Sequence, residues 1–242
     1  MKKILVLAAL SLLLGACEKN DSSKEQPAGE YPYYRNMSSY VLGYCVFDET
    51  QLTILRNNGY ADLQLRFVGP VYYSPEMVAQ EKKEPITQSQ EVADKFLTFA
   101  AQNGDTNYHG DVFVGFWPSL TESIQAIHVV ADRDLDEAHP AGTLLDDVIY
   151  FATCDRYAFI QSGYKGDEKQ NYKVGGTLSQ WPGSKLKIPY SFIPLSFSAD
   201  NFSNTYPKQW WEVSTTITVT VVNMKGETKT ASSTMNPSED VI

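Results

Sequence analysis

The stretch WEVSTTITVTVVNMKGETKTASSTM, residues 211–235, has the clearest hairpin pattern of the chain. Its first half alternates apolar and polar residues, which is the pattern of a strand with one buried face. The turn residues follow at 223–226, where Gly226 supplies the positive φ that a tight hairpin connection needs. The returning segment, 227–235, is polar, so we expect it to lie exposed or at the edge of a sheet. The stretch therefore predicts a β-hairpin.

Strand patterns continue through most of the chain. Residues 61–73 place Leu63, Leu65 and Phe67 in alternation until Gly69-Pro70 interrupts the strand. In the same way, 185–197 places Leu186, Ile188, Tyr190 and Phe192 in alternation. Shorter strand-like segments lie at 40–47, 112–117, 124–131, 148–153 and 157–161. Many short strands separated by turn residues predict a mainly β, β-sandwich-like domain.

One segment, 89–102, has helical periodicity. Its apolar residues share one face, namely Val92, Phe96, Phe99 and Ala100. Ser89 or Thr87 is suited to cap its start, and Asn103-Gly104 is suited to end it. We expect this helix to cover one end of a sheet.

The N-terminus has the features of an export signal. Lys2 and Lys3 precede the apolar run 4–14, which is shorter than the roughly 20 residues needed to cross a bilayer. The run ends in LGAC, residues 14–17, and this motif resembles the lipobox of bacterial lipoproteins. The resemblance implies cleavage before Cys17 and attachment of two or three acyl chains, which anchor stably. An ordinary signal peptide with a chance cysteine is the alternative.

The predicted organisation has three parts: a signal peptide at 1–16, a lipidated cysteine with a flexible polar tether at 17–30, and one β-rich domain at 31–242. Glu18 and Asp21 loosely resemble the surface-export signals of Bacteroidota lipoproteins. We therefore expect an outer-membrane, lipid-anchored protein, with the periplasmic and cell-surface sides both open. The net charge of −9 and the absence of a basic tract argue against nucleic acid as a partner.

A second resemblance lies in IQAIHVVADRDLDEAHPAGTLLDDVIYF, residues 124–151. The order of strand, aspartate-rich turn and second apolar strand looks like a domain of unknown function found in Bacteroidota lipoproteins. That family has no established activity, so the resemblance implies only the cellular address and a compact β-rich domain.

The acidic loop 131–147 is the first candidate site. Carboxylates at Asp132, Asp134, Asp136 and Glu137 are the hard oxygen ligands that calcium takes. The EF-hand pattern fails, because Glu137 stands where that loop needs glycine. A calcium site of another kind and a plain solvated loop both remain open.

The same loop raises the question of catalysis. His139 lies among these carboxylates, as acid–base chemistry in a hydrolase would require. The chain has no G-x-S-x-G, H-E-x-x-H, P-loop or G-x-G-x-x-G motif. We therefore expect a protein that is not an enzyme and whose module binds or is structural, and we keep the hydrolase as the weaker alternative.

Cysteines and aromatic residues supply the remaining candidates. Cys45 and Cys154 could form a disulfide in an exported protein or remain as two buried thiols. Aromatic residues make up 12% of the chain, and exposed rings at Trp210, Trp211 and Tyr34 could stack on sugars. Burial of the same rings in a sandwich core is the competing interpretation. Surface glycan binding is thus the main alternative function.

Overall fold

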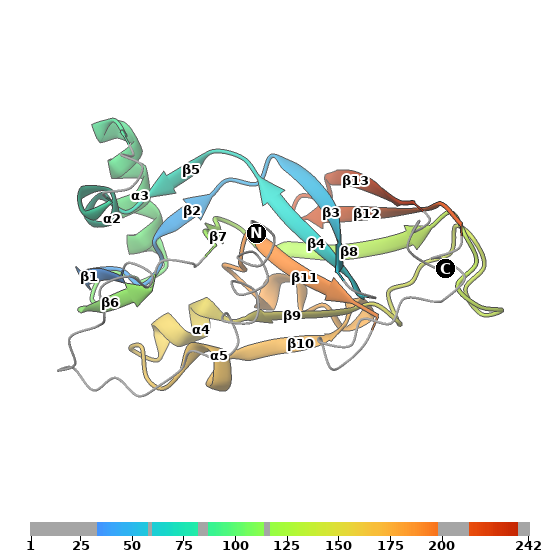
Figure 1. Cartoon of the computed structure of the whole chain (residues 1–242). Helices are drawn as coiled ribbons and strands as arrows, with labels where there is room; N and C mark the ends of the chain where they lie inside the picture. Colours follow the sequence, from blue (N-terminus) through green and yellow to red (C-terminus); the bar gives the residue numbers. More distant parts are fainter. Residues whose placement is uncertain (1–32, 58–59, 82–86, 114–116, 198–212, 237–242) are drawn as a thin grey trace.

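The computed structural model describes residues 33–57, 60–81, 87–113, 117–197 and 213–236. Two antiparallel sheets form the larger part of the molecule (Figure 1). The larger sheet has the order β10 (Lys173–Thr177), β9 (Tyr150–Cys154), β11 (Phe192–Ser196), β4 (Tyr60–Val68) and β3 (Glu49–Asn57). The smaller sheet has the order β13 (Thr228–Met235), β12 (Thr215–Asn223) and β8 (Ile124–Ala131). The mainly β prediction is confirmed, and 40% of the residues are in strands.

The main hydrophobic core lies between these two sheets. Leu63 and Leu65 of β4 and Val219 of β12 are completely buried in one cluster. Burial alternates along all of β12, as its sequence predicts, so every second side chain points outward. β13 pairs with β12 and ends the sheet order, which confirms the expected hairpin with an edge strand.

Two smaller sheets and the α-helices form the other end of the molecule (Figure 1). One sheet contains β5 (Val71–Tyr73), β2 (Gly43–Cys45) and β7 (Ser119–Leu120), and the other pairs β1 (Tyr33–Met37) with β6 (Gly110–Phe113). Only Gly69 and Pro70 separate β4 from β5. A side chain at Gly69 would place its Cβ 1.9 Å from the Val46 carbonyl oxygen, so this close approach requires glycine.

The predicted helix is α3 (Gln90–Gln102), and it packs against β5 and β2. Ser89 caps it by accepting a hydrogen bond from the Val92 N–H, and the helix ends at Asn103. Its buried face contains Phe96 and Ala100, as predicted, together with Ala93. The helix therefore covers the small three-stranded sheet.

Two parts of the sequence prediction were wrong. The segment 157–161 belongs to the short helix α4 (Arg156–Gln161), because the Asp155 side chain accepts from the Ala158 N–H and caps a helical turn. Within 185–197 only β11 is a strand, and its inward residues are Ile193 and Leu195. Phe192 consequently points to the outer face, since a shift of one residue exchanges the two faces of a strand.

Short helical elements complete the described fold. Besides α4, they are the α-helices α2 (Pro75–Gln80) and α5 (Glu168–Asn171) and the 3₁₀ turns η1 (Leu178–Gln180) and η2 (Gly183–Lys185). Only α3 is seven residues or longer, so the expectation of one covering helix is confirmed at that length.

Candidate functional site

The acidic loop 131–147 covers an edge of the smaller sheet. It folds back along the side of β8 that β12 does not occupy, at the far right in Figure 1. The Gly142 N–H donates to the Ala131 carbonyl at 2.8 Å, and the Leu145 N–H donates to the Val129 carbonyl at 2.8 Å. An uncovered edge strand invites pairing with other chains, so this loop protects β8.

The aspartates of the loop accept hydrogen bonds from backbone amides. Asp132 Oδ1 accepts from the Thr216 N–H at 2.8 Å, and Asp134 Oδ1 accepts from the Ala141 N–H at 2.7 Å. Irregular backbone that has no strand partner needs such acceptors. These carboxylates therefore hold the shape of the loop.

The calcium hypothesis gains no support from this arrangement. Among the described residues, no group of three or more His, Cys, Asp or Glu side chains is placed to hold a metal ion. Asp132, Asp134 and Asp136 each turn toward a different backbone amide, and Glu137 is exposed. Alternating positions in the sequence do not converge, because the loop follows the edge of β8 and does not encircle a point.

His139 is held between two carboxylates. Its Nδ1 lies 2.7 Å from Asp136 Oδ1, and its Nε2 lies 3.2 Å from Asp147 Oδ1. Hydrogen bonds to Asp136 and then to Asp147 raise the pKa of His139 above its ordinary value of 6.5. Both ring nitrogens contact carboxylates of the loop, so His139 links Asp136 to Asp147. These contacts give the ring a structural role within the loop.

A second histidine makes a carboxylate contact that the sequence did not reveal. His128 Nδ1 lies 2.6 Å from Asp146 Oδ2, and Asp146 Oδ1 accepts from the Val129 N–H at 3.0 Å. A catalytic triad needs a hydroxyl or thiol on the other ring nitrogen. Within the described ranges, His128 Nε2 makes no such hydrogen bond. The pair fixes the loop to β8.

The two cysteines of the domain are free thiols. Cys45 and Cys154 are both buried and do not form a disulfide, which agrees with the alternative of two buried thiols. Burial raises the pKa of Cys45 to about 11 and that of Cys154 to about 12. Neither thiol is suited to act as a nucleophile.

Of the three predicted aromatic residues, the structure describes only Tyr34. Tyr34 is only 4% exposed, and its hydroxyl donates to Glu81, so its ring offers no face to a sugar. Trp210 and Trp211 lie outside the described residues, as does Cys17.

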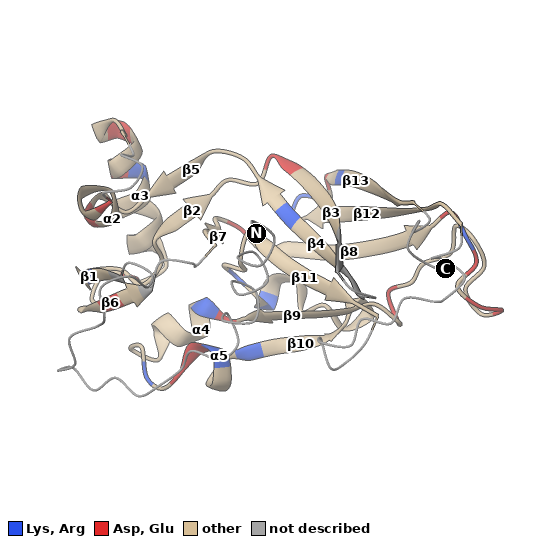
Figure 2. Cartoon of the chain, in the orientation of Figure 1, with Lys and Arg blue, Asp and Glu red and all other residues tan. Residues whose placement is uncertain are grey.

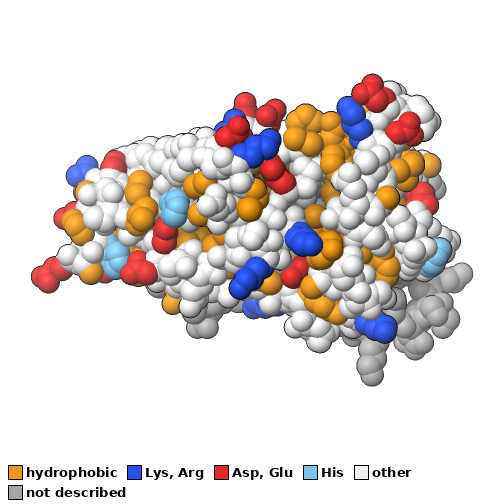
Figure 3. Space-filling view, turned by 180° about the vertical axis from the view of Figure 1, so that it is seen from behind, with side chains coloured by type: hydrophobic (Ala, Val, Ile, Leu, Met, Phe, Trp, Pro, Cys, Tyr) orange, Lys and Arg blue, Asp and Glu red, His pale blue; other side chains and the backbone are white. Residues whose placement is uncertain are grey.

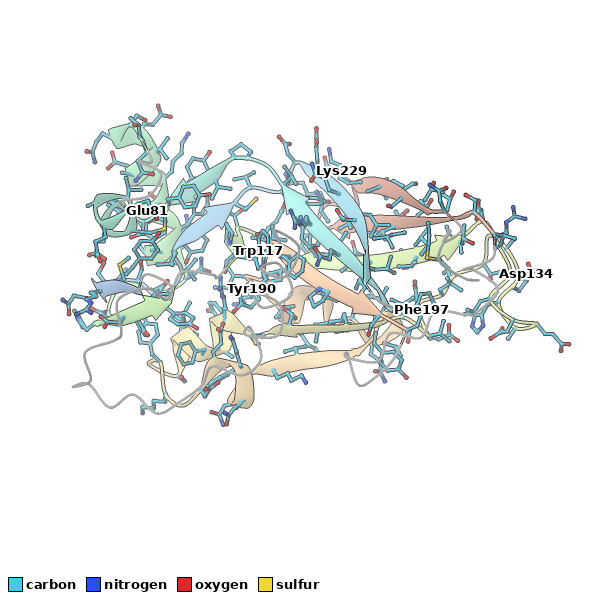
Figure 4. The ribbon with its side chains drawn as sticks, viewed as in Figure 1. Glu81, Trp117, Asp134, Tyr190, Phe197 and Lys229 are labelled. Atoms are coloured by element: carbon cyan, nitrogen blue, oxygen red, sulfur yellow. The ribbon has the colours of Figure 1, made fainter. Side chains whose placement is uncertain are left out.

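A different set of partly exposed side chains forms a platform on the outer face of the larger sheet. We use the name aromatic platform for Trp117, Phe192 and Arg66. The rings of Trp117 and Phe192 are stacked, with centroids 4.9 Å apart and planes 23° from parallel. Arg66 Cζ lies 5.0 Å from the Trp117 centroid and 6.0 Å from the Phe192 centroid. Figure 4 shows Trp117 near the middle of the molecule.

The register of two strands builds this platform. Phe192 of β11 lies directly opposite Arg66 of β4, and Gln51 of β3 lies opposite Arg66 on its other side. Side chains in such positions are neighbours on one face of a sheet. Gln51 is exposed, so its amide borders the platform.

A buried polar cluster supports the platform from below. Arg156 is 1% exposed, and its Nη1 donates to the Trp117 carbonyl at 3.0 Å and to Ser119 Oγ at 2.7 Å. Its Nε lies 3.3 Å from Oε1 of Glu168, which is also buried. The backbone of Trp117 is therefore fixed by a buried ion pair.

Tyrosines complete this cluster, which we call the Arg156 cluster (Arg156, Glu168, Tyr40 and Tyr190). Glu168 Oε2 accepts from the Tyr40 hydroxyl at 2.6 Å and from the Tyr190 hydroxyl at 2.9 Å. The Arg156 guanidinium lies 3.7 Å from the centroid of the Tyr190 ring. Burial and the nearby Glu168 carboxylate raise the pKa of Tyr40 well above its usual value, so its hydroxyl stays a donor.

Sequence reasoning missed the platform for a definite reason. Its three residues are far apart in the chain, and the pattern at 185–197 assigned Phe192 to the inner face. The one available signal was Arg66, which alternates with Leu65 and Phe67 and therefore had to point outward.

Comparison with known proteins gives no relative, because no family model, no curated protein and no solved structure matches the chain. In the described part of the chain, no helix is long and apolar enough to cross a membrane.

Proposed function

We propose that the mature chain is a lipid-anchored module of the bacterial cell envelope that binds a ligand and does not catalyse a reaction. The apolar run that ends in LGAC supports acylation at Cys17, and the polar segment 17–30 suits a tether. In this proposal the module belongs to the outer membrane. The carboxylates and histidines of its acidic loop hold that loop in place. The aromatic platform is therefore the surface that we propose binds the ligand.

The ligand class that we propose is a saccharide. The observation that carries this proposal is the partly exposed Trp117–Phe192 stack on the outer face of an antiparallel sheet. The C–H faces of sugar rings pack against flat aromatic rings, and a few polar groups beside such rings set specificity. The exposed Gln51 amide opposite Arg66 is suited to bind sugar hydroxyls.

Acylation is tested on the full chain expressed with its own leader. We expect the wild-type protein to enter the detergent phase on phase separation, with fatty acid on the N-terminal peptide by mass spectrometry. Cys17→Ser is expected to remain in the aqueous phase. Wild-type protein in the aqueous phase with its leader intact would contradict the anchor.

Saccharide binding is tested with the full-length Cys17→Ser chain against neutral and acidic oligosaccharides, by calorimetry and tryptophan emission. We expect at least one sugar to bind and Trp117→Ala to abolish the heat and the emission change. Trp181→Phe is the matched control, because Trp181 packs on Phe151 at 4.8 Å and donates to the Ile124 carbonyl, outside the platform. Binding that survives Trp117→Ala, or a panel without any binder, would refute the proposal.

A further inference from the structure

Arg66 is a cation with most of its hydrogen-bond donors unused. An arginine side chain has five N–H donors. In the part of the chain that the structure describes, the guanidinium makes one long hydrogen bond, from Nη2 to Gln64 Oε1 at 3.4 Å. Its Nε is buried without a hydrogen-bond partner. None of the ion pairs among the described residues includes Arg66.

This lack of a carboxylate partner stands out because the protein is acidic. The chain has 29 acidic and 20 basic residues. The other arginine near the platform, Arg156, is paired with Glu168. In Figure 2 the blue segment of β4, which contains Arg66, lies beside the uncharged strand β11. Two aromatic rings hold the Arg66 guanidinium in place, and no anion of the described residues neutralises it.

A fixed arginine with free donors is suited to bind a carboxylate. Its planar fork matches two carboxylate oxygens, and such charged hydrogen bonds are stronger than neutral ones. The rings that position Arg66 also offer stacking area, so one ligand can use both. A sugar ring that carries a carboxylate has this combination of an apolar face and an anionic group.

We infer that Arg66 binds the carboxylate of an acidic sugar whose ring packs on Trp117 and Phe192. This inference rests on the saccharide-binding function proposed above. The ligand carries isolated carboxylates among neutral sugars and is not a dense polyanion. A single partly exposed cation on a protein of net charge −9 cannot offset the repulsion of many charges, although salt limits that repulsion to about 8 Å.

The test compares matched sugars that differ in the carboxylate. The carboxylate can belong to a sialic acid or to a uronic acid, so sialyllactose is paired with lactose, and a glucuronic-acid-capped xylobiose with xylobiose. Calorimetry with the full-length Cys17→Ser chain is expected to show one acidic sugar binding about tenfold or more tightly than its neutral partner. The pair that shows this difference identifies the source of the carboxylate.

Variants assign the preference to Arg66. Arg66→Gln is expected to remove the difference between acidic and neutral sugar, so that the two bind with the same affinity. Arg66→Lys keeps the charge without the fork and is expected to restore part of the difference. Arg133→Gln is the matched control, because Arg133 is an exposed arginine on the acidic loop. The melting temperature of each variant confirms that it is folded.

The outcomes separate the two proposals. Equal affinity for acidic and neutral sugars, or a preference that survives Arg66→Gln, overturns the role of Arg66 and leaves saccharide binding intact. Absence of binding to every sugar in a wide panel overturns saccharide binding itself. Tighter binding of a dense polyanion such as polygalacturonate than of the singly charged sugars also contradicts the inference.

Discussion

The two outer faces of the sandwich differ in how their polar groups are satisfied. On the smaller sheet, outward side chains of β12 and β13 pair with each other across the strands. The three pairs are Thr216–Thr234 at 3.1 Å, Thr218–Ser232 at 2.8 Å and Thr220–Thr230 at 3.4 Å. This region is largely white in Figure 3, which shows few charged or apolar side chains over it. The outer face of the larger sheet carries the aromatic platform instead, where Arg66 has one long hydrogen bond.

The proposed function assigns the ligand to the outer face of the larger sheet because of this difference. Hydroxyls that already pair with one another, and that small water molecules can also reach, gain little from a ligand. A guanidinium with unused donors beside two partly exposed rings gains both hydrogen bonds and buried apolar area. In terms of the proposed function, we call the outer face of the smaller sheet the inert face and the outer face of the larger sheet the receptive face.

The largest effect is expected when the support of the receptive face is broken. Arg156→Met leaves Glu168 as a buried charge without its partner and removes the hydrogen bond to the Trp117 carbonyl. Loss of one member of a buried ion pair costs about 3–5 kcal/mol. Urea unfolding followed by circular dichroism measures this loss.

The control removes both charges together. The double variant Arg156→Met, Glu168→Gln removes both charges and keeps an amide oxygen that can accept from the Tyr40 and Tyr190 hydroxyls. It should therefore recover part of the loss, because no buried charge is left without its partner. Its binding to sugar should remain weaker than that of the wild type, since the Trp117 carbonyl still lacks its donor. A cost below about 1 kcal/mol for Arg156→Met alone would show that the Arg156 cluster does not support the platform.

The next largest effect is expected at the platform itself. Trp117→Ala removes the stack on Phe192 and the ring beneath Arg66. Aromatic pairs add about 0.5–1.5 kcal/mol beyond their buried area, so we expect a loss of about 1–2 kcal/mol in the free energy of unfolding. Trp117→Phe should keep most of the stability and part of the sugar affinity. A Trp117→Ala protein as stable as the wild type would mean that the rings do not pack as described.

The inert face could be predicted from the sequence, because the residues that form it lie close together along the chain. The inert face follows from one hairpin, and alternation within 211–235 predicts which residues of β12 point outward. The helix 89–102 was equally predictable, because its cap, period and end are local. Short-range patterns carry this information directly.

The receptive face was not predictable in the same way. Its three residues come from different segments, and only the observed register of β11 and β4 places Phe192 opposite Arg66. Arg156 gave no sign of burial, because charged residues are rarely buried and the ion pair with Glu168 is long-range. For the acidic loop, the carboxylates can be read from the sequence, but the backbone amides that donate to them cannot.

The acidic loop beside the inert sheet should respond to pH. The raised pKa of His139 means that its stabilisation is complete below the ordinary value of 6.5 and is lost as pH rises through the raised pKa. The hydrogen bond from His139 lowers the pKa of Asp136 below 3.8. The stabilisation that ionised Asp136 contributes is therefore lost as pH falls through that lowered pKa. The loop is thus most stable between these two transitions.

The measurement is an NMR titration of the His139 ring together with unfolding at pH 6 and pH 9. We expect a midpoint above 6.5, and a larger destabilisation by His139→Gln at pH 6 than at pH 9. Both effects are smaller than at the platform, because the partner carboxylates are exposed to solvent. A midpoint at or below 6.5 would contradict the described contacts, and His109→Gln is the control variant, since His109 is exposed outside this loop.

The smallest effect is expected on the inert face. This prediction tests whether the hydroxyl-lined face takes any part in sugar binding. Thr218→Val removes the hydrogen bond between Thr218 Oγ1 and Ser232 Oγ, but water can satisfy the remaining hydroxyl, and valine is well suited to a strand. We therefore expect the free energy of unfolding to change by less than about 0.5 kcal/mol, and the affinity for sugar to remain that of the wild type. If Thr218→Val weakened sugar binding as much as Trp117→Ala does, the hydroxyl face would have to be the recognition surface. The unused donors of Arg66 would then need another explanation.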